Sequence, residues 1–341
     1  GENGQGKTNL LEAAAACSTM RLFRTAQKKE GLRFGENHAF IFADFLAQER
    51  DISLELRFSR TKAMEIYKNG VRQKRQSDAQ GLLKTVLFCP EDLMLVRAGA
   101  AARRRFLDTA LCQMRPNYAR YLEEYNRLHE HKTRILRDSE EKPSLLSMWE
   151  DFSLRMAHIG AQIIRYRAYY CRKLLKAAAA VYADIAPHEV LSGVYKTVSS
   201  VTDPFADART IEKQLIDHVF SHKTAEIAAK SCLSGPHKDD LELLLDGRSA
   251  ASFGSQGQVR TCTLSLKLAE RELFFDEDGE YPVLLLDDVL SELDRRRQDF
   301  VLNRISAGQV MITCCEDGIS EKLRAGAVFH IQNGEKSAET H

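Results

Sequence analysis

The chain has 341 residues, of which 44% are hydrophobic and 28% charged, a balance that can bury a sizeable core and excludes a disordered chain. Eight scattered cysteines without a C-x-x-C pair exclude a zinc ribbon or a disulfide framework and indicate reduced thiols in a cytoplasmic protein. The net charge of +1 hides an asymmetry, because residues 1–176 carry 32 Lys and Arg against 21 Asp and Glu, whereas residues 177–341 carry 17 against 27.

The basic half indicates a polyanionic partner, unless the two halves attract each other or the charges belong to solvated helix faces. No stretch approaches the apolar length of a membrane span, so no membrane partner is expected.

The first eight residues fit the pattern G-x-x-x-x-G-K-T of a Walker A loop, and apolar residues between Leu10 and Ala15 predict a helix directly after it. The loop consists of Gly1, Glu2, Asn3, Gly4, Gln5, Gly6, Lys7 and Thr8. Glycines let successive N–H groups point at phosphate oxygens, and the helix adds its positive N-terminal end. We therefore expect these eight residues to bind ATP, with Lys7 at the β- and γ-phosphates and the Thr8 hydroxyl on Mg²⁺. Because the chain opens inside this motif without an initiator Met, we expect further residues upstream.

After the Walker A helix, the spacing of apolar residues first predicts strands and then helices. Alternating apolar residues predict strands over 39–71, with a hairpin turn at Asn69-Gly70, and residues 86–88 predict a short buried strand. From about 104 to 230 the apolar spacing is helical, and the tyrosines there are expected in the core rather than in a base-stacking surface.

Two features at the ends of the helical region could carry chemistry. For the basic run Arg103-Arg104-Arg105 two interpretations stay open, contact with the phosphates of DNA or nucleotide and a solvated helix start. His237 follows Gly235-Pro236 and is expected to be a turn histidine rather than a catalytic group.

A second candidate anion site opens a later helix. Alternating leucines over 241–245 predict a strand, and apolar positions over 259–273 predict a helix. The segment Ser-Phe-Gly-Ser-Gln-Gly-Gln at 252–258 begins this helix with small residues, which favour anions at a helix N-terminus. It is either only a cap, or it serves the nucleotide of another subunit through Ser255, Gly257 and Gln258, as an S-G-G-Q-like signature does in ABC-type ATPases.

The apolar run Val283–Leu286 predicts a buried parallel strand that ends in two carboxylates. The carboxyl end of such a strand is where α/β sheets bind ligands. We therefore expect Asp287 to hold Mg²⁺, as in a Walker B motif, and Asp288 to be the catalytic carboxylate that polarises the attacking water. The sequence Ser-Glu-Leu-Asp at 291–294 resembles a D-loop, and another buried strand is predicted at 310–312.

Together these elements predict an α/β fold, an ABC-type P-loop ATPase head with an antiparallel β subsheet and an inserted helical arm. We expect the first part of the head, with Walker A and the subsheet, at 1–103 and the arm at 104–232. The second part of the head, with signature, Walker B and D-loop, is expected at 233–341.

Longer motifs resemble those of the RecF family, bacterial recombination-repair proteins that are SMC-like ABC ATPases. The motifs are GENGQGKTNLLEA at the start, CPEDLMLVRAG and RRRFLD within 89–108, LSGPHKDDLELLLDG at 233–247, GSQGQVR at 254–260 and LLLDDVLSELD at 284–294. The resemblance implies an arm without a long coiled coil, an ATP-dependent homodimer, and binding of gapped or junction duplex DNA. It also implies cooperation with RecO and RecR in recombinational repair, replication-fork maintenance and the SOS response to DNA damage.

The sequence departs from the family pattern at three places. The β-rich segment that precedes Walker A in the family is absent from this sequence. The switch position after the 310–312 strand, a histidine in many ABC ATPases, reads Thr313-Cys314, which predicts that turnover is slow or depends on another group. No glutamine marks the Q-loop near Pro90, where Glu91 and Asp92 are the candidates.

The leading functional hypothesis is an ATP-switched DNA clamp with a weak, DNA-stimulated ATPase. Two alternatives stay open, a small-molecule P-loop kinase that is active as a monomer and an ABC ATPase module of another assembly, such as a transporter. The signature and D-loop speak against the kinase, and a response to DNA would speak against the transporter module.

Overall fold

The computed structural model describes residues 4–25, 28–314, 326–332 and 334–336. The chain forms two compact units, one of Gly1–Met94 with Thr263–His341 and one of Leu95–Cys262. The three segments expected from the sequence, with limits at 103 and 232, stay a prediction about functional domains. Among the described residues, no helix has the length and apolar character that crossing a bilayer requires.

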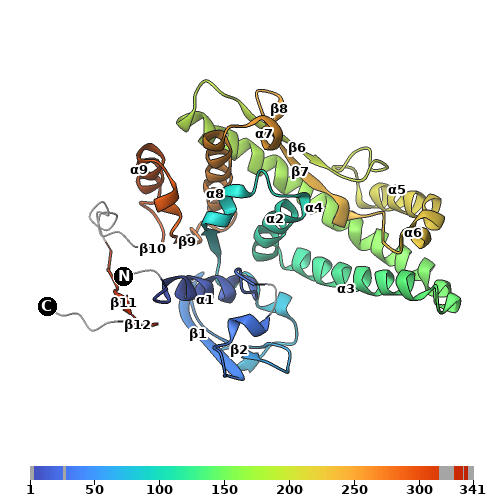
Figure 1. Ribbon diagram of the computed structural model, residues 1–341, viewed down its shortest axis with the longest axis horizontal. Coiled ribbons are helices and arrows are strands. Elements are labelled where there is room, and N and C mark those ends of the chain that lie inside the picture. Colours follow the sequence, from blue (N-terminus) through green and yellow to red (C-terminus); the bar gives the residue numbers. More distant parts are fainter. Residues whose placement is uncertain (1–3, 26–27, 315–325, 333, 337–341) are drawn as a thin grey trace. The chain divides into compact units, whose positions relative to one another are not determined.

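The first unit combines a P-loop helix with parallel and antiparallel strands (Figure 1). Its helices are α1 (Lys7–Thr19), α9 (Arg295–Arg304) and the 3₁₀ turns η1 (Lys28–Gly31), η2 (Gln76–Asp78), η3 (Pro90–Met94) and η6 (Val289–Glu292). Its strands are β1 (His38–Ala47), β2 (Arg50–Ser59), β3 (Glu65–Lys68), β4 (Val71–Arg72), β5 (Thr85–Phe88), β9 (Val283–Asp287), β10 (Val310–Thr313), β11 (Ile331–Gln332) and β12 (Glu335–Lys336).

Three parallel strands in the order β10-β9-β5 form the sheet that carries the candidate site. The central strand β9 is the continuous apolar run of the sequence, and Leu284, Leu285 and Leu286 are each at most 1% exposed. In the register, Thr313 at the end of β10 pairs with Asp287 at the end of β9. The polar side chains therefore gather at the carboxyl edge of the sheet, as expected for an α/β ligand site.

Helix α1 packs against both sheets of this unit. Leu11 and Ala15 contact the parallel sheet at Leu285, while Ala16 and Cys17 join the core of the antiparallel sheet β1-β2-β3-β4. The face predicted from Leu10 to Ala15 is wrong at Leu10, which is 49% exposed. The buried side of α1 is rotated toward Ala16 and Cys17 because the helix lies between two sheets rather than on one.

The antiparallel sheet follows the predicted alternation. Every second residue of β2 from Ile52 to Phe58 is buried, and β3 and β4 are joined by the hairpin turn at Asn69-Gly70, where both residues have positive φ angles of 48° and 76°. This is the backbone of a type I′ turn, which Asn-Gly favours.

The second unit is mostly helical, with one small sheet. Its helices are α2 (Ala100–Met114), α3 (Pro116–Asp138), α4 (Trp149–Ile185), α5 (Ala208–Ser221), α6 (Lys223–Ala229), α7 (Ala250–Phe253) and the 3₁₀ turns η4 (Pro143–Met148) and η5 (Pro236–Lys238). Its strands are β6 (Leu191–Lys196), β7 (Asp240–Leu245) and β8 (Arg248–Ser249), in the order β6-β7-β8.

The helical stretch predicted from 104 to 230 contains a strand that the sequence analysis missed, β6, which pairs with β7 in antiparallel register. In β6 only Leu191 is buried, and the remaining residues alternate between exposed and half-buried, so the strand carries no strong apolar pattern. Two of the three tyrosines of α3 are core residues as predicted, since Tyr118 and Tyr125 are 0% and 2% exposed, whereas Tyr121 is half-buried.

A buried arginine ties five elements of this unit together. The Arg167 guanidinium of α4 donates to Asp108 of α2 at 2.9 Å and to Asp239 at 3.1 Å, and it also donates to the Pro236 carbonyl at 2.7 Å. Tyr118 of α3 and Tyr195 of β6 complete the cluster, with the Tyr195 hydroxyl donating to Asp239. Burial raises the pKa of Asp239 to about 7, with Arg167 opposing the shift.

Helix α8 (Gln256–Asp278) crosses the boundary between the units, which falls after Cys262. The apolar positions predicted for this helix are buried, including Val259, Leu266 and Leu273. One continuous helix thus begins with the predicted signature and continues into the unit that contains Walker A.

Candidate functional site

The Walker A loop leads directly into α1. Gly4 and Gly6 have φ angles of 78° and 99°, a left-handed backbone that glycine adopts without strain. At Gly6 a Cβ would also lie 3.1 Å from the Cα of Gly334, whose N–H donates to the Gln5 carbonyl at 2.9 Å. The loop therefore requires glycine at position 6 for both backbone and space. Residues 1–3 of the predicted motif lie outside the described residues.

Thr8, Asp287 and Thr313 meet at the carboxyl edge of the parallel sheet. The Thr8 hydroxyl donates to Asp287 Oδ1 at 2.9 Å, and the Thr313 hydroxyl donates to the same oxygen at 2.7 Å. Asp287 is only 6% exposed, so its carboxylate is held by the protein rather than by solvent. Two residues predicted as Mg²⁺ ligands, 279 positions apart in the chain, are thus in direct contact.

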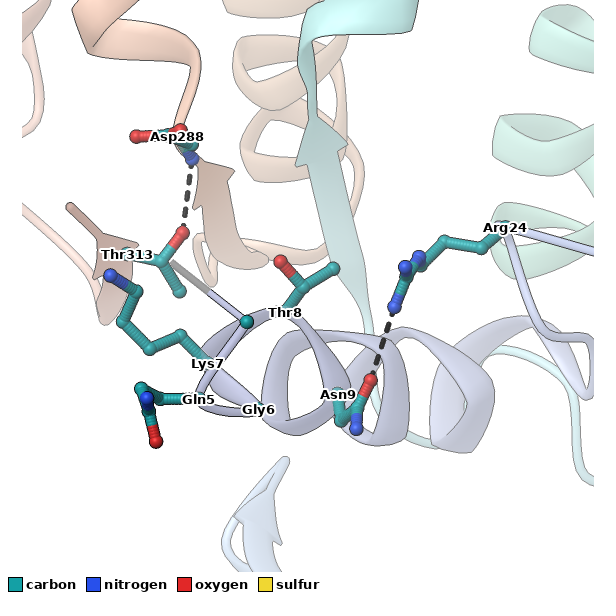
Figure 2. Close-up of a pocket in the computed structure, with 9 residues that line it drawn as sticks. Gln5, Gly6, Lys7, Thr8, Asn9, Arg24, Asp288 and Thr313 are labelled. Carbon is teal, nitrogen blue, oxygen red and sulfur yellow. Dashed lines mark hydrogen bonds between the residues drawn. The ribbon is translucent and has the colours of Figure 1, made fainter. Parts of the chain in front are cut away.

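Asp288 follows in a left-handed conformation with φ 49° and ψ 12°. Its backbone N–H donates to the Thr313 hydroxyl at 3.0 Å (Figure 2). Its carboxylate accepts a hydrogen bond from the Ser291 hydroxyl of the predicted D-loop at 3.3 Å. In the sequence, Thr313 stands out only because the switch histidine is missing there. Its hydroxyl contacts both the Asp287 carboxylate and the Asp288 backbone N–H, and it therefore fixes both acidic residues.

Lys7 extends along the loop toward the end of β10 (Figure 2). Its Nζ donates to the Cys314 carbonyl at 3.0 Å. This places the cation beside the end of β10 and next to the pocket that the loop encloses.

Several of these groups line one pocket of about 340 Å³, and Asp287 is not among its lining residues (Figure 2). The lining residues are Gly4, Gln5, Gly6, Lys7, Thr8, Asn9, Arg24, Asp288 and Thr313. Asn9 and Arg24 were not predicted. Arg24 Nη1 donates to Asn9 Oδ1 at 3.1 Å, and its backbone N–H donates to Glu12 at 3.0 Å, so α1 positions this exposed arginine. A lone arginine in a loop gives no signal in the sequence.

The Q-loop candidates have other roles in the structure. Asp92 accepts a hydrogen bond from the Cys89 backbone N–H at 3.1 Å and lies 3.5 Å from Lys267 of α8. Glu91 is exposed. Next to Lys267, burial raises the pKa of Glu270 to about 7. Asp92 therefore stabilises the end of β5 and its contact with α8, and it does not line the pocket.

The predicted signature residues, 252–258, lie in the second unit, which ends at Cys262. The Ser255 hydroxyl accepts from the Gln258 N–H at 3.2 Å, and the Gln258 side chain accepts from the Ser255 N–H at 2.7 Å, a reciprocal cap of α8. Ser255 is exposed and Gly257 is half-buried. The turn is rigid, because a Cβ at Gly254 would lie 2.5 Å from the Ala250 carbonyl oxygen, and Arg97 donates to the Gly254 carbonyl at 2.7 Å.

Two basic residues of the run at 103–105 are structural, which differs from both interpretations of the sequence. Arg103 pairs with both oxygens of Asp240 at 2.7 and 2.8 Å, and Arg104 donates to the Asp239 carbonyl at 2.6 Å. Arg105 alone of the three is exposed.

His237 is a structural histidine. Its Nε2–H donates to the Cys232 carbonyl at 3.1 Å, so Nδ1 accepts from the Tyr125 hydroxyl at 2.7 Å. Burial lowers the pKa of His237 to about 3. The ring is therefore neutral at physiological pH and fully used in hydrogen bonds.

Comparison with known proteins decides the family. This chain is 37% identical to the DNA replication and repair protein RecF of Bacillus subtilis, over 98% of the chain and 91% of that protein. It is 32% identical to RecF of Acetivibrio thermocellus, over 97% of the chain and 90% of that protein. The chain belongs to the RecF family of DNA replication and repair proteins. No protein-family model matches it.

Solved structures give the same result for the fold. The recombination mediator protein RecF-ATPrS in the RecFOR pathway superposes with a TM-score of 0.90 at 31% identity, covering 99% of this chain and 91% of that chain. RecF-ATP gives the same TM-score at 30% identity, covering 99% and 90%. An Smc head domain from Pyrococcus yayanosii, 12% identical with a TM-score of 0.51, covers 95% of this chain and 88% of that chain and shares the fold alone. The predicted ABC-type head without a long coiled coil is confirmed.

Proposed function

We propose that this chain is an ATP-dependent DNA-binding protein in which two copies join around ATP, hold gapped or junction DNA, and separate after slow hydrolysis. The observation that carries the proposal is the contact of Thr8, Asp287 and Thr313 at the edge of a pocket that Lys7 and the glycine loop also line.

The pocket suits a nucleoside triphosphate. Its volume of about 340 Å³ lies at the lower end of the usual range for small-molecule sites. Backbone N–H groups of the loop and the N-terminus of α1 favour phosphate. When ATP enters, Lys7 exchanges the Cys314 carbonyl for the phosphates, a stronger partner because it is anionic. The solved RecF-ATP structure of a relative supports this ligand.

Thr8 and Asp287 fit a magnesium ion. Mg²⁺ in nucleotide sites takes one or two protein oxygens and completes its shell with phosphate oxygens and water. No group of three or more His, Cys, Asp or Glu suited to a metal occurs among residues 4–25, 28–314, 326–332 and 334–336. Two converging oxygens therefore match a metal bound together with ATP, and when bound the ion neutralises charge on the phosphates.

Asp288 is the proposed catalytic carboxylate, which orients water for attack on the γ-phosphate. Its backbone is fixed by Thr313 and its side chain by Ser291, so both neighbours control its direction. Because position 313 is a threonine with no proton-transfer capacity at neutral pH, we propose that turnover is slow. Arg24 is a further proposed contact to the nucleotide.

The second half of each ATP site is proposed to come from the partner copy. Ser255 and Gln258 cap α8 rigidly and present an exposed hydroxyl at a helix N-terminus, together with Gly257. In a two-fold dimer, each copy would present this cap to the nucleotide in the other copy.

DNA, RecO and RecR are the proposed partners, since the relatives are DNA replication and repair proteins and the solved relatives carry the name of the RecFOR pathway. A cytoplasmic location is proposed. The described cysteines are free, which suits a reducing compartment.

Asp288→Asn tests this proposal. Asparagine keeps the size of the side chain and tolerates the left-handed backbone at this position. Since general-base catalysis contributes about 10²–10⁴-fold, we expect ATP hydrolysis to fall at least 100-fold while ATP-bound dimers accumulate. Phosphate release and light scattering with ATP and Mg²⁺ measure both effects.

Asp44→Asn is the matched control, because Asp44 is exposed on β1 of the same unit. It should leave hydrolysis and dimerisation unchanged. If Asp288→Asn weakens the dimer as strongly as loss of Lys7 does, Asp288 serves binding and the proposed catalytic role is wrong.

A further inference from the structure

Helix α4 carries a surface that the site does not use. Between Asp151 and Asp184 the helix contains no acidic residue. Four of its cations follow one another along one side, interrupted by one aromatic residue. We name this surface the α4 stripe, and it consists of Arg165, Tyr169, Arg172, Lys173 and Lys176.

The spacing puts the α4 stripe on one face. At 3.6 residues per turn, the five positions fall within an arc of about 100° and extend over about 16 Å along the axis. Arg172, Lys173 and Lys176 are exposed. The face is therefore a continuous basic ridge rather than a scatter of surface charges.

The cations of the α4 stripe lack anionic partners among the described residues, where no ion pair involves any of the four. Arg165 Nε is a buried atom without a hydrogen-bond partner in the described part of the chain. Other cations of the chain do pair with carboxylates, as Arg103 does with Asp240 and Arg167 with Asp108. The positive charge of the stripe is thus available to an external polyanion.

Two exposed aromatic rings accompany these cations. Tyr169 and Phe205 are 40% and 36% exposed, and they meet edge to face with centroids 5.4 Å apart. The Arg172 guanidinium carbon lies 5.0 Å from the Tyr169 centroid and 4.8 Å from that of Phe205. Aromatic and guanidinium planes of this kind stack on unpaired bases, with little dependence on sequence.

The acidic residues beside Phe205 do not neutralise the stripe through ion pairs. Asp203 accepts the Phe205 backbone N–H at 2.9 Å, and Asp207 caps α5 through the N–H groups of Arg209 and Thr210 at 3.0 and 3.1 Å. Both carboxylates accept backbone N–H groups and keep their negative charge, so phosphate contacts are expected from the α4 side of the patch.

We propose that the α4 stripe contacts the phosphate backbone of DNA, and that the Tyr169–Phe205 pair stacks on an unpaired base at a gap or junction. This inference rests on the proposed DNA-binding function and assigns it to a surface. Phosphate contacts supply affinity and position without reading sequence, while the rings favour DNA that contains single-stranded bases.

The charge part is tested with the triple variant Arg172→Gln, Lys173→Gln, Lys176→Gln in the full chain, with ATP and Mg²⁺ and a fluorescent gapped duplex. Each lost phosphate contact lowers the slope of log K against log salt by about 0.9. We expect the slope to fall by about 2 to 3 and the affinity to fall at least tenfold at about 0.15 M salt. ATP-dependent dimerisation should stay as in the unaltered chain.

The matched control is Arg127→Gln, Arg134→Gln, Arg137→Gln. These arginines are exposed on α3 of the same unit, and their substitution removes the same charge as the α4 triple variant. Unlike the α4 stripe, this stretch of α3 also carries acidic residues, Glu123 and Glu130. Their slope should change by less than about 1. An unchanged slope and affinity in the α4 triple variant would overturn the proposal, and loss of RecO or RecR binding alone would assign the stripe to a protein partner.

The stacking part is tested with Tyr169→Ala and Tyr169→Phe. Loss of the ring should weaken binding to the gapped probe about tenfold and leave a blunt duplex nearly unaffected, while phenylalanine should restore the gapped affinity. Equal affinity of Tyr169→Ala for the gapped probe would overturn the stacking contact. If the unaltered chain binds neither probe, the proposed DNA-binding function itself fails, which is a different result.

Discussion

Lys7→Ala is expected to lower the affinity for ATP about 100-fold. A hydrogen bond to a charged group contributes about 1.5–3 kcal/mol, and the upper value converts to roughly this factor when the partner is a triphosphate. The shorter side chain also loses the hydrogen bond from Lys7 Nζ to the Cys314 carbonyl, just beyond the end of β10. Titration of a fluorescent ATP analogue measures the affinity, and phosphate release measures the loss of hydrolysis.

Lys62→Ala is the control for charge. Lys62 is exposed in the same unit, on the loop between β2 and β3, and the variant removes the same charge without touching the pocket. ATP affinity should remain within about twofold. Full hydrolysis by Lys7→Ala, with ATP affinity unchanged, would contradict the assignment of the glycine loop as the phosphate site.

Arg167→Met should cost about 3–5 kcal/mol in the free energy of unfolding, because it leaves the buried carboxylate of Asp239 and the half-buried carboxylate of Asp108 without their cation. Arg167 is 3% exposed and Asp239 is fully buried. Burial raises the pKa of Asp239 already, so without Arg167 this carboxyl gains a proton, which places the cost nearer the lower limit. Denaturation in urea, followed by fluorescence, measures the change.

The single tryptophan makes this measurement specific. Trp149 is the only Trp of the chain, lies at the start of α4 and is 0% exposed, so its fluorescence reports on the unit that contains Arg167. Arg127→Met, an exposed arginine on α3, should change the free energy of unfolding by less than about 0.5 kcal/mol. Equal midpoints for the two variants would show that the buried cluster contributes little to stability.

Much of the fold could be predicted because its strongest patterns are local. The run Val283–Leu286 predicts the central parallel strand without ambiguity, and Asn69-Gly70 fixes a hairpin by its backbone preferences alone. Strand β6 could not be predicted, because a short strand with only Leu191 buried has no pattern of its own and depends on pairing with β7. Tertiary pairing decides such a segment.

The acidic residues of the site could be predicted because they follow a strong local pattern, whereas Thr313 and Arg24 could not. Asp287 follows a recognisable strand, and the structure brings it to Thr8. The role of Thr313 depends on the register of β10 with β9, and that of Arg24 depends on a contact with Asn9. Neither the register nor the contact can be predicted from the spacing of residues.

At the basic run 103–105, a clear sequence pattern suggests a function that the structure does not support. Three consecutive arginines suggest a surface for phosphates, yet Arg103 lies in a bidentate pair with Asp240. The sequence shows charge but not its partner, which follows only from the packing of α2 on β7. The four cations of the α4 stripe gave a weaker signal in the sequence, and none of them forms an ion pair with another described residue.

The most direct test of the composite ATP site mixes two inactive variants, Lys7→Ala and Ser255→Arg. The first lacks the phosphate cation, and the second should bind ATP but obstruct dimer closure with bulk and charge. Ser255→Ala controls for the lost cap of α8, since it removes the same hydrogen bond without the bulk. Because Ser255→Ala also removes the hydroxyl that is proposed to contact the nucleotide, it should weaken dimerisation, but less than Ser255→Arg does.

With random pairing, half of the dimers are mixed, and each mixed dimer has one site with both defects and one site with neither. If one intact site suffices, the mixture should recover about a quarter of the unaltered rate of ATP hydrolysis, an estimate from two-fold symmetry alone. A kinase acting as a monomer could not recover activity, because neither chain contains a working site. Normal dimerisation and hydrolysis by Ser255→Arg alone would contradict the account, because residues 252–258 would then be only a helix cap.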